Sequence, residues 1–253
     1  MNANPTSPLI ACRDVTKVFE VGRLKVNALR GVSLSVAAGE FVALVGPSGS
    51  GKTTLLNLVG ALDVASSGVV EVVGQDLSKL DRGRRAELRL RRIGFVFQAY
   101  NLVPVLTARE NVEFVLELQG VGAERKRRAL EILDRVKLAD LADRRPPEMS
   151  GGQQQRVAVA RAIASRPPLV LADEPTANLD GENAEVLMHL MRELRDQEGM
   201  TFVFSTHDLR VVEHAARVIT LEDGRVARDV QREEEAPHEI LKGVGKLRPG
   251  LVP

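Results

Sequence analysis

The first third of the chain alternates apolar and polar positions in the manner of half-buried antiparallel strands. Residues 9–19 and 27–36 follow this alternation, and the turn Ala38-Gly39-Glu40 then leads into a continuous apolar run, Phe41–Val45. A continuous run of that length predicts a buried strand. Further strands are predicted at 68–74, 93–97, 169–172 and 201–205, and as a hairpin around Glu222-Asp223-Gly224 at 218–221 and 225–227.

The middle of the chain has the spacing of helices and no strand pattern. Thr107 with Glu110, and Ser150 with Gln153, have the spacing of capping boxes, each ahead of a helically spaced apolar run. We therefore expect a helical subdomain over about 99–165, inserted into an α/β core. In addition to the helix that begins after Ser150, helices are predicted at 82–92, 111–118, 123–136 and 182–197.

The composition suits an ordinary globular protein of the cell interior. The chain has 253 residues, of which 44% are hydrophobic and 27% charged, so one domain over 1–228 with a weakly ordered tail over 229–253 is expected. A formal charge of +1 implies no global attraction to nucleic acid, and no such partner is predicted. The single Cys12 fits a reducing compartment. Residues 1–8 do not resemble a secretion signal, and no apolar run approaches the about 20 residues that span a bilayer, so another chain would have to hold this one at a membrane.

The strongest chemical signal is the segment Gly46–Thr53, which has the form G-x-x-x-x-G-K-[ST] of a phosphate-binding loop. It follows the predicted strand Phe41–Val45 and leads into a helical run at 54–59, which is the context that the motif requires. In such a loop the backbone N–H groups and the helix N-terminus face a phosphate, a lysine such as Lys52 reaches the terminal phosphates, and the hydroxyl of Thr53 binds magnesium. A glycine-rich turn before a helix is the alternative.

Two more segments carry groups suited to nucleotide chemistry. Asp173 and Glu174 end an apolar strand, where one carboxylate can reach a magnesium ion and the other can activate water, although such a pair can also cap a helix. Ser150-Gly151-Gly152-Gln153 combines a hydroxyl, two glycines and a helix start, which can be a second anion-binding surface or a plain helix cap. Gln98 and His207 each follow a predicted strand, where a polar residue is often satisfied locally.

Taken in this order, these segments resemble the motifs of the ATP-binding subunits of ABC transporters. The resemblance covers about residues 9–228. It implies an α/β fold, namely a P-loop NTPase core with a mostly parallel central sheet, an antiparallel β subdomain and the inserted α-helical subdomain. It also implies an ATPase that works with ATP and Mg²⁺.

The resemblance also assigns roles to individual residues. Glu174 would be the catalytic base, and Gln98 and His207 would sense the γ-phosphate, while Thr53, Gln98 and Asp173 would be the magnesium set. Phe19 would stack on adenine, with a core position as the alternative. The remaining expected nucleotide contacts are Gly46, Pro47, Ser48, Gly49, Ser50, Gly51, Lys52, Thr53 and Thr54, the signature residues Ser150, Gly151, Gly152 and Gln153, and Asp180 of the D-loop.

In this family two copies pack head to tail, and each ATP lies between the phosphate loop of one copy and the signature motif of the other. The resemblance therefore implies a second copy of the chain as partner. It also implies transmembrane permease subunits that dock near Gln98–Leu106, a segment unusually apolar for a connection, although packing between subdomains would explain that too. The chain would then be cytoplasmic and peripheral on the inner face of the membrane.

Four segments are similar to the branch with lipoprotein-release and macrolide-export ATPases: Ala61-Leu62-Asp63, Ser66-Ser67-Gly68, 97–104 and 107–112. That branch implies export or extraction of an envelope substrate of lipoprotein, macrolide or peptide type. The alternatives are an amino-acid importer, the cell-division ABC complex, a soluble ABC protein of translation or DNA repair, and a scaffold without catalysis. The complete set of Asp173, Glu174 and His207 argues against the scaffold.

Overall fold

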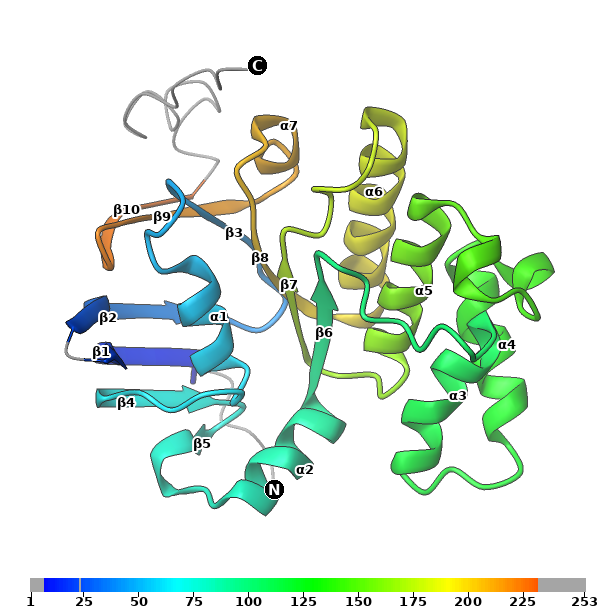
Figure 1. Ribbon diagram of the computed structural model, residues 1–253, viewed down its shortest axis with the longest axis horizontal. Helices are drawn as coiled ribbons and strands as arrows, with labels where there is room; N and C mark the ends of the chain where they lie inside the picture. The colour runs from blue at the N-terminus through cyan, green and yellow to red at the C-terminus, as the bar shows by residue number, and fades with distance from the viewer. Residues whose placement is uncertain (1–6, 23, 232–253) are drawn as a thin grey trace.

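Two β-sheets form the frame of the molecule (Figure 1). The computed structural model describes residues 7–22 and 24–231. Its strands are β1 Ile10–Val21, β2 Leu24–Val36, β3 Phe41–Val45, β4 Ser67–Val72, β5 Gln75–Asp76, β6 Ile93–Phe97, β7 Leu169–Asp173, β8 Thr201–Ser205, β9 Arg217–Glu222 and β10 Arg225–Gln231. One sheet has the order β2-β1-β4-β5 and is antiparallel, and the other has the order β10-β9-β3-β8-β7-β6.

The central strands β3, β7 and β8 of the six-stranded sheet are buried on both faces, which explains why they are continuous apolar runs. Along β3, Phe41, Ala43 and Val45 belong to one hydrophobic cluster, whereas Val42 and Leu44 belong to the other. Successive side chains of a strand point to opposite faces, so each strand contributes to both clusters. The rings of Phe41, Phe202 and Phe204 meet in the first cluster, with centroids 5.6 and 5.0 Å from Phe41.

The helices cover the two faces of this sheet. They are α1 Lys52–Val59, α2 Arg82–Arg92, α3 Ala108–Leu118, α4 Arg125–Arg135, α5 Gly151–Ile163, α6 Gly181–Glu198 and α7 Leu209–Val212, with short 3₁₀ helices η1 Leu77–Lys79, η2 Ala139–Leu141 and η3 Pro146–Glu148. Helix α1 packs in the cluster between the two sheets. Helices α3, α4 and α5 gather beyond β6, in green on the right of Figure 1.

Both predicted capping boxes are present. Thr107 accepts a hydrogen bond from the backbone N–H of Glu110 at the start of α3, and Glu110 accepts one from the N–H of Thr107 in return. Ser150 and Gln153 make the same reciprocal pair at the start of α5. Each pair satisfies N–H groups that the first turn of a helix leaves without partners, so both helix starts are set by local sequence.

The end of the described chain differs from the expected boundary. The tail predicted over 229–253 begins inside β10, where Val230 is buried and residue 231 still pairs with β9. The alternation of apolar and charged residues in Arg225–Gln231 is that of an edge strand, and its high charge is the reason why the strand predicted from the sequence ended too early. Residues 232–253 lie outside the described residues. The helices α3–α5 fall within the segment expected to be the helical subdomain, whose exact bounds stay a prediction.

The parallel strands bring their carboxyl ends to one edge of the sheet. Strand β3 pairs in parallel with β8 and β9, and β7 pairs in parallel with β6 and β8. The segments that follow β3, β6, β7 and β8 therefore leave the sheet on the same side. In open α/β sheets this edge is where ligands bind.

Candidate functional site

A glycine-rich loop joins β3 to α1 at the carboxyl edge of the central sheet. Gly46 and Gly51 have φ angles of 145° and 102°, a region that favours glycine. A Cβ atom on Gly46 would lie 2.1 Å from the carbonyl oxygen of Leu221, and one on Gly51 would lie 2.7 Å from that of Ala28. The loop is therefore pressed against the backbones of β9 and β2, and only glycine fits at these two positions.

A cavity of about 700 Å³ lies against this loop. Its lining residues come from β2, from the loop with the start of α1, and from the segments after β6, β7 and β8. They are Val26, Asn27, Ala28, Gly46, Pro47, Ser48, Gly49, Gly51, Lys52, Thr53, Thr54, Gln98, Glu174 and His207. The structure thus brings together most of the predicted loop residues and all three predicted catalytic residues, while Ser50, within the loop, is buried and does not line the cavity.

Lys52 supplies the positive charge of the cavity. Its ammonium donates to the carbonyl oxygens of Gly46 and Pro47 at 2.8 and 3.0 Å, and the residue is only 9% exposed. Burial lowers the pKa of Lys52, and the nearby carboxylates of Glu174 and Asp173 act in the opposite direction. A cation at the entrance of helix α1, beside loop N–H groups, suits a chain of phosphates.

Thr53 and Asp173 form a pair of oxygen donors beside the loop. The Thr53 hydroxyl donates to Oδ1 of Asp173 at 3.2 Å, and the fully buried Ser205 hydroxyl donates to the same oxygen at 2.5 Å. Magnesium prefers such oxygen ligands and is commonly held by one or two carboxylates together with substrate phosphates. No cluster of three or more His, Cys, Asp or Glu that could hold a metal occurs in the part of the chain that the structure describes. The donors present therefore fit a magnesium ion bound jointly with a nucleotide.

Glu174 stands directly after this pair, in a conformation that few residues adopt. Its φ of 48° lies in the left-handed region, and its N–H donates to the hydroxyl and to the carbonyl oxygen of Ser205 at 3.0 and 3.2 Å. Oε1 of Glu174 lies 2.9 Å from Nδ1 of His207. The turn after β7 thus aims a carboxylate at a histidine on the rim of the cavity, an arrangement that can accept a proton from water.

The signature residues form a second group, away from this cavity. None of the residues that line the cavity belongs to Ser150–Gln153, and Asp180 is also absent from the described lining. Instead, a Cβ atom on Gly152 would lie 2.5 Å from Oδ1 of Asn183, whose amide is bound to Asp180, the N-cap of α6. A Cβ on Gly151 would lie 2.9 Å from the Tyr100 hydroxyl. The chain therefore presents two separate groups with helix starts suited to anions.

Phe19 lies next to the cavity but is not one of the residues that line it. It pairs with Val26 across β1 and β2, is 39% exposed, and has the ammonium of Lys17 4.9 Å above its ring. Its stacking role stays a prediction. The lining residues Val26–Ala28 carried no signal in the sequence, because strand β2 reads as an ordinary half-buried strand.

Two further residues make contacts beside the site: Ser205, which the sequence did not single out, and Asn178, which the resemblance placed in the D-loop with Asp180 but without a contact of its own. Ser205 links Asp173 to the backbone of Glu174, and its position opposite Asp173 follows from the parallel register of β7 and β8. Asn178 donates its side-chain amide to the carbonyl oxygen of Gln98 at 2.9 Å. The sequence does contain a signal for Ser205, because it is a polar residue at the end of the apolar strand Phe202-Val203-Phe204-Ser205.

Comparison with known proteins decides the family. The family described as "ABC transporter" matches residues 29–177. The chain belongs to the ABC transporter family. An uncharacterized ABC transporter ATP-binding protein of Thermotoga maritima is 50% identical over 214 residues, which cover 84% of this chain and 91% of that protein. The recognition from sequence motifs is thereby confirmed, and the chain is an ATP-binding domain of the ABC type.

Solved structures support the same conclusion for the fold. The ATP-binding cassette MJ0796 of Methanocaldococcus jannaschii, solved as a dimer in a post-hydrolysis state with ADP and Pi, is 44% identical with a TM-score of 0.82. The match covers 88% of this chain and 98% of that one. The predicted α/β fold with a P-loop NTPase core is confirmed, and the likeness supports an ATPase.

A third relative is longer than this chain. The macrolide export ATP-binding/permease protein MacB of Brucella melitensis is 44% identical over 247 residues, which cover 94% of this chain but 38% of that protein. In the described part of this chain, no helix is long and apolar enough to cross a membrane.

Proposed function

We propose that this chain is the ATP-hydrolysing subunit of an export or extraction transporter, working as a head-to-tail homodimer. The observation that carries the proposal is the convergence of Lys52, Thr53 with Asp173, and Glu174 with His207 around one cavity. The loop amides and Lys52 hold the phosphates, and Glu174 accepts a proton from the water that attacks the terminal phosphate. Thr53 and Asp173, together with Gln98, would hold a Mg²⁺ ion, which would supply positive charge to neutralise the phosphates.

The second half of each site comes from the partner copy. Ser150–Gln153 is separate from the cavity of its own chain, yet it has a helix start and two glycines that let a phosphate approach. Closure of two copies around ATP would place this group and Asp180 opposite the loop of the other copy, with Phe19 against the base. The dimeric structures of MJ0796 support this arrangement.

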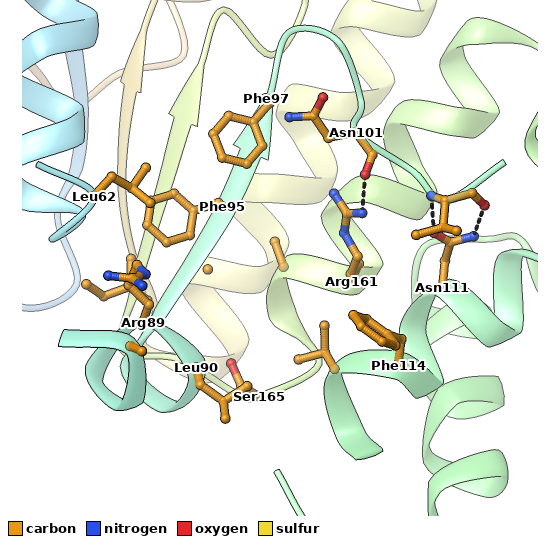
Figure 2. A pocket seen from close by; sticks show the side chains of 16 residues that line it. Leu62, Arg89, Leu90, Phe95, Phe97, Asn101, Asn111, Phe114, Arg161 and Ser165 are labelled. Carbon is orange, nitrogen blue, oxygen red and sulfur yellow. Dashed lines mark hydrogen bonds between the residues drawn. The ribbon is translucent and has the colours of Figure 1, made fainter. Parts of the chain in front are cut away.

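A groove between the sheet and the helical subdomain is the proposed docking surface for the membrane subunits. Its walls are β6, α2, α3 and α5 with the segment after Gln98, it encloses about 550 Å³, and we call it the docking groove (Figure 2). Within Gln98–Leu106, Val105 is 71% exposed whereas Leu102 packs against the hydrophobic core. One part of the segment therefore contributes to packing between subdomains, and another part is free to contact a partner. The MacB relative, with its permease part, favours the macrolide-export and lipoprotein-release branch, and the chain would be held on the cytoplasmic face by its partner.

The decisive experiment is the substitution Glu174→Gln. The amide keeps the shape of the carboxylate but cannot take a proton, so turnover should be lost while ATP binding is retained and a stable dimer accumulates. The measurements are phosphate release and size-exclusion chromatography with and without ATP. The matched control is Glu131→Gln on α4, the same chemical change outside the cavity, which should hydrolyse ATP normally. Normal steady-state hydrolysis by Glu174→Gln would refute the assignment of the base.

The substitution Ser150→Arg tests the site completed by two copies. It should impair hydrolysis and dimer formation while the monomer keeps its affinity for ATP, because Ser150 is separate from the cavity of its own chain. Binding of a fluorescent ATP analogue to the monomer measures this. Loss of that binding would argue that the signature group serves its own chain.

A further inference from the structure

A second cavity lies at the amino ends of β6, β7 and β8, on the edge of the sheet opposite the phosphate loop. In Figure 1 this edge is found where β6 begins, directly after α2. The cavity encloses about 720 Å³, and three arginines line it: Arg92, Arg135 and Arg166. We call it the arginine cavity. None of the residues assigned to the nucleotide site lines it, so its charge needs an explanation of its own.

The charges that line the arginine cavity do not balance. Glu198 is the one acidic residue among the described residues of the lining, and it forms a close ion pair with Arg135. Arg92 and Arg166 form no side-chain hydrogen bond and no ion pair with the described part of the chain. An arginine stays charged in proteins, so the lining has two positive charges without a matching negative charge.

Helix ends by themselves do not explain these two arginines. Basic side chains are favourable near the C-terminus of a helix, where carbonyl oxygens lack partners, and α2 ends at Arg92. An arginine in that role donates to a carbonyl oxygen, as Arg156 does to that of Val136 at the end of α4, at 3.3 Å. Arg92 and Arg166 donate to no carbonyl oxygen of the described chain, so their N–H groups are available to a ligand.

The backbone of Arg166 gives independent support for a binding role. Its φ is 49°, in the left-handed region that few residues other than glycine adopt. The conformation is fixed on both sides, because the N–H of Arg166 donates to the carbonyl oxygen of Ile163 at 2.8 Å and Pro167 and Pro168 follow. Glycine would adopt this φ without strain, so the chain has an arginine here at a cost in stability. Strained residues of this kind concentrate at binding and active sites.

A phosphate group is the ligand that fits this lining. The fork of N–H donors on a guanidinium matches the oxygens of a phosphate, and arginine is favoured wherever phosphate is recognised. A phosphate monoester carries a charge of about −1.5 to −2 at neutral pH, close to the two unmatched positive charges. Small-molecule sites enclose about 300–1,000 Å³, so the cavity has room for an organic part beside the phosphate. Pro167, Pro168 and the buried Met200 supply apolar lining for that part.

We propose that Arg92, Arg135 and Arg166 bind the phosphate group of a phosphate monoester, at a site separate from that of ATP. Arg92 and Arg166 supply the unmatched charge, and Arg135, held in place by Glu198, supplies a third set of N–H donors. The ligand is a soluble phosphate ester or the headgroup of a phosphatidic acid, which present the same group. The proposal does not rest on the proposed function, because none of its residues is assigned to nucleotide binding or hydrolysis.

The test is a calorimetric titration of the full chain with inorganic phosphate. A saturating non-hydrolysable ATP analogue with Mg²⁺ fills the phosphate loop, so the added phosphate reports on other sites. In the double variant Arg92→Gln with Arg166→Gln, we expect the affinity for phosphate to fall at least about tenfold, because two charge-assisted contacts are lost. The double variant should fold and hydrolyse ATP as the wild type does, since neither side chain has a partner among the described residues.

Two further variants separate a specific site from a general effect of charge or of folding. Arg82→Gln with Arg144→Gln is the matched control, because it removes the same charge from two exposed arginines that do not line the cavity, and it should keep the wild-type affinity. Arg166→Gly relieves the strained φ, so weaker phosphate binding by this variant comes from the missing guanidinium and not from unfolding.

Flotation with phosphatidylcholine vesicles, with and without phosphatidic acid, distinguishes the two sources of the phosphate. Capture by phosphatidic acid that the Arg92 and Arg166 double variant loses supports the site and identifies a lipid headgroup. Binding of inorganic phosphate without capture by these vesicles supports the site and identifies a soluble phosphate ester.

Three results would overturn the proposal. They are absence of phosphate binding by the wild type at about 10 mM, equal affinity of the wild type and the Arg92 and Arg166 double variant, and an equal loss of affinity in the control variant. ATP hydrolysis is measured in parallel and concerns the proposed function alone. A chain that does not hydrolyse ATP but loses phosphate affinity only in the cavity variants refutes the proposed function and supports the arginine cavity as a phosphate site.

Discussion

Removal of the Ser205 hydroxyl is the sharpest perturbation of the proposed site that leaves every assigned catalytic residue in place. Ser205 is fully buried at the end of β8, donates to Oδ1 of Asp173 at 2.5 Å, and accepts the N–H of Glu174 at 3.0 Å. One hydroxyl thus orients both the carboxylate that we propose binds magnesium and the backbone of the residue that we propose as the base. We expect Ser205→Ala to lower kcat and to raise the Mg²⁺ concentration needed for half-maximal rate.

The magnitude follows from the contacts that remain. A hydrogen bond to a charged group contributes about 1.5–3 kcal/mol. Thr53 still donates to the same oxygen of Asp173, and the N–H of Glu174 keeps its second bond to the Ser205 carbonyl at 3.2 Å. The lower end of the range therefore applies, which corresponds to a fall in kcat of about tenfold to thirtyfold.

The assay is steady-state phosphate release over a Mg²⁺ titration at saturating ATP. Thr220→Val is the matched control, because the Thr220 hydroxyl is buried in the same sheet and has no hydrogen-bond partner among the described residues. Its kcat and Mg²⁺ requirement should be unchanged. A Ser205→Ala protein that is folded and has the wild-type kcat and Mg²⁺ requirement would refute the positioning role, since a purely structural hydroxyl would change only stability.

Three further predictions concern the loop, the docking segment and acid stability. Gly46→Ala should abolish ATP binding or folding, because its Cβ would overlap a carbonyl oxygen of β9; ATP binding at wild-type affinity by a folded variant would contradict this. Asn111→Leu should lower the free energy of unfolding in urea by about 2–4 kcal/mol, because the buried amide accepts the N–H of Val103 and donates to carbonyl oxygens of the segment just before α3; an unchanged midpoint would refute it. Hydrogen bonds from Thr107 lower the pKa of Glu110 in the folded state, so the cap stabilises the fold at pH values above the unfolded-state pKa of Glu110, and this stabilisation is lost as the pH falls through the folded-state pKa. Glu110→Gln should therefore make the free energy of unfolding depend less on pH below about 5. A variant with the same pH profile as the wild type would contradict the role of the cap.

Elements with local causes can be identified from the amino-acid sequence. The loop Gly46–Thr53 could be identified because its glycines, lysine and threonine stand at fixed spacing between a strand and a helix. The caps at Thr107 and Ser150 depend on residues three positions apart, so their geometry is written in short segments. The continuous apolar runs of β3, β7 and β8 indicated a sheet buried on both faces, and the order of the motifs indicated the family.

Contacts between groups that are distant in the sequence depend on the packing of the elements. The pairing of Asp173 with Ser205 depends on the register of β7 and β8, which are joined by helix α6 and far apart in sequence. The separation of Ser150–Gln153 from the phosphate loop depends on how α5 packs beyond the sheet edge. Arg92 and Arg166 look like ordinary arginines of a basic helix and a loop, and only packing places both beside Arg135 in a cavity whose one described carboxylate is already paired. Local spacing encodes elements, whereas burial and pairing are properties of surfaces that exist only after the elements have packed.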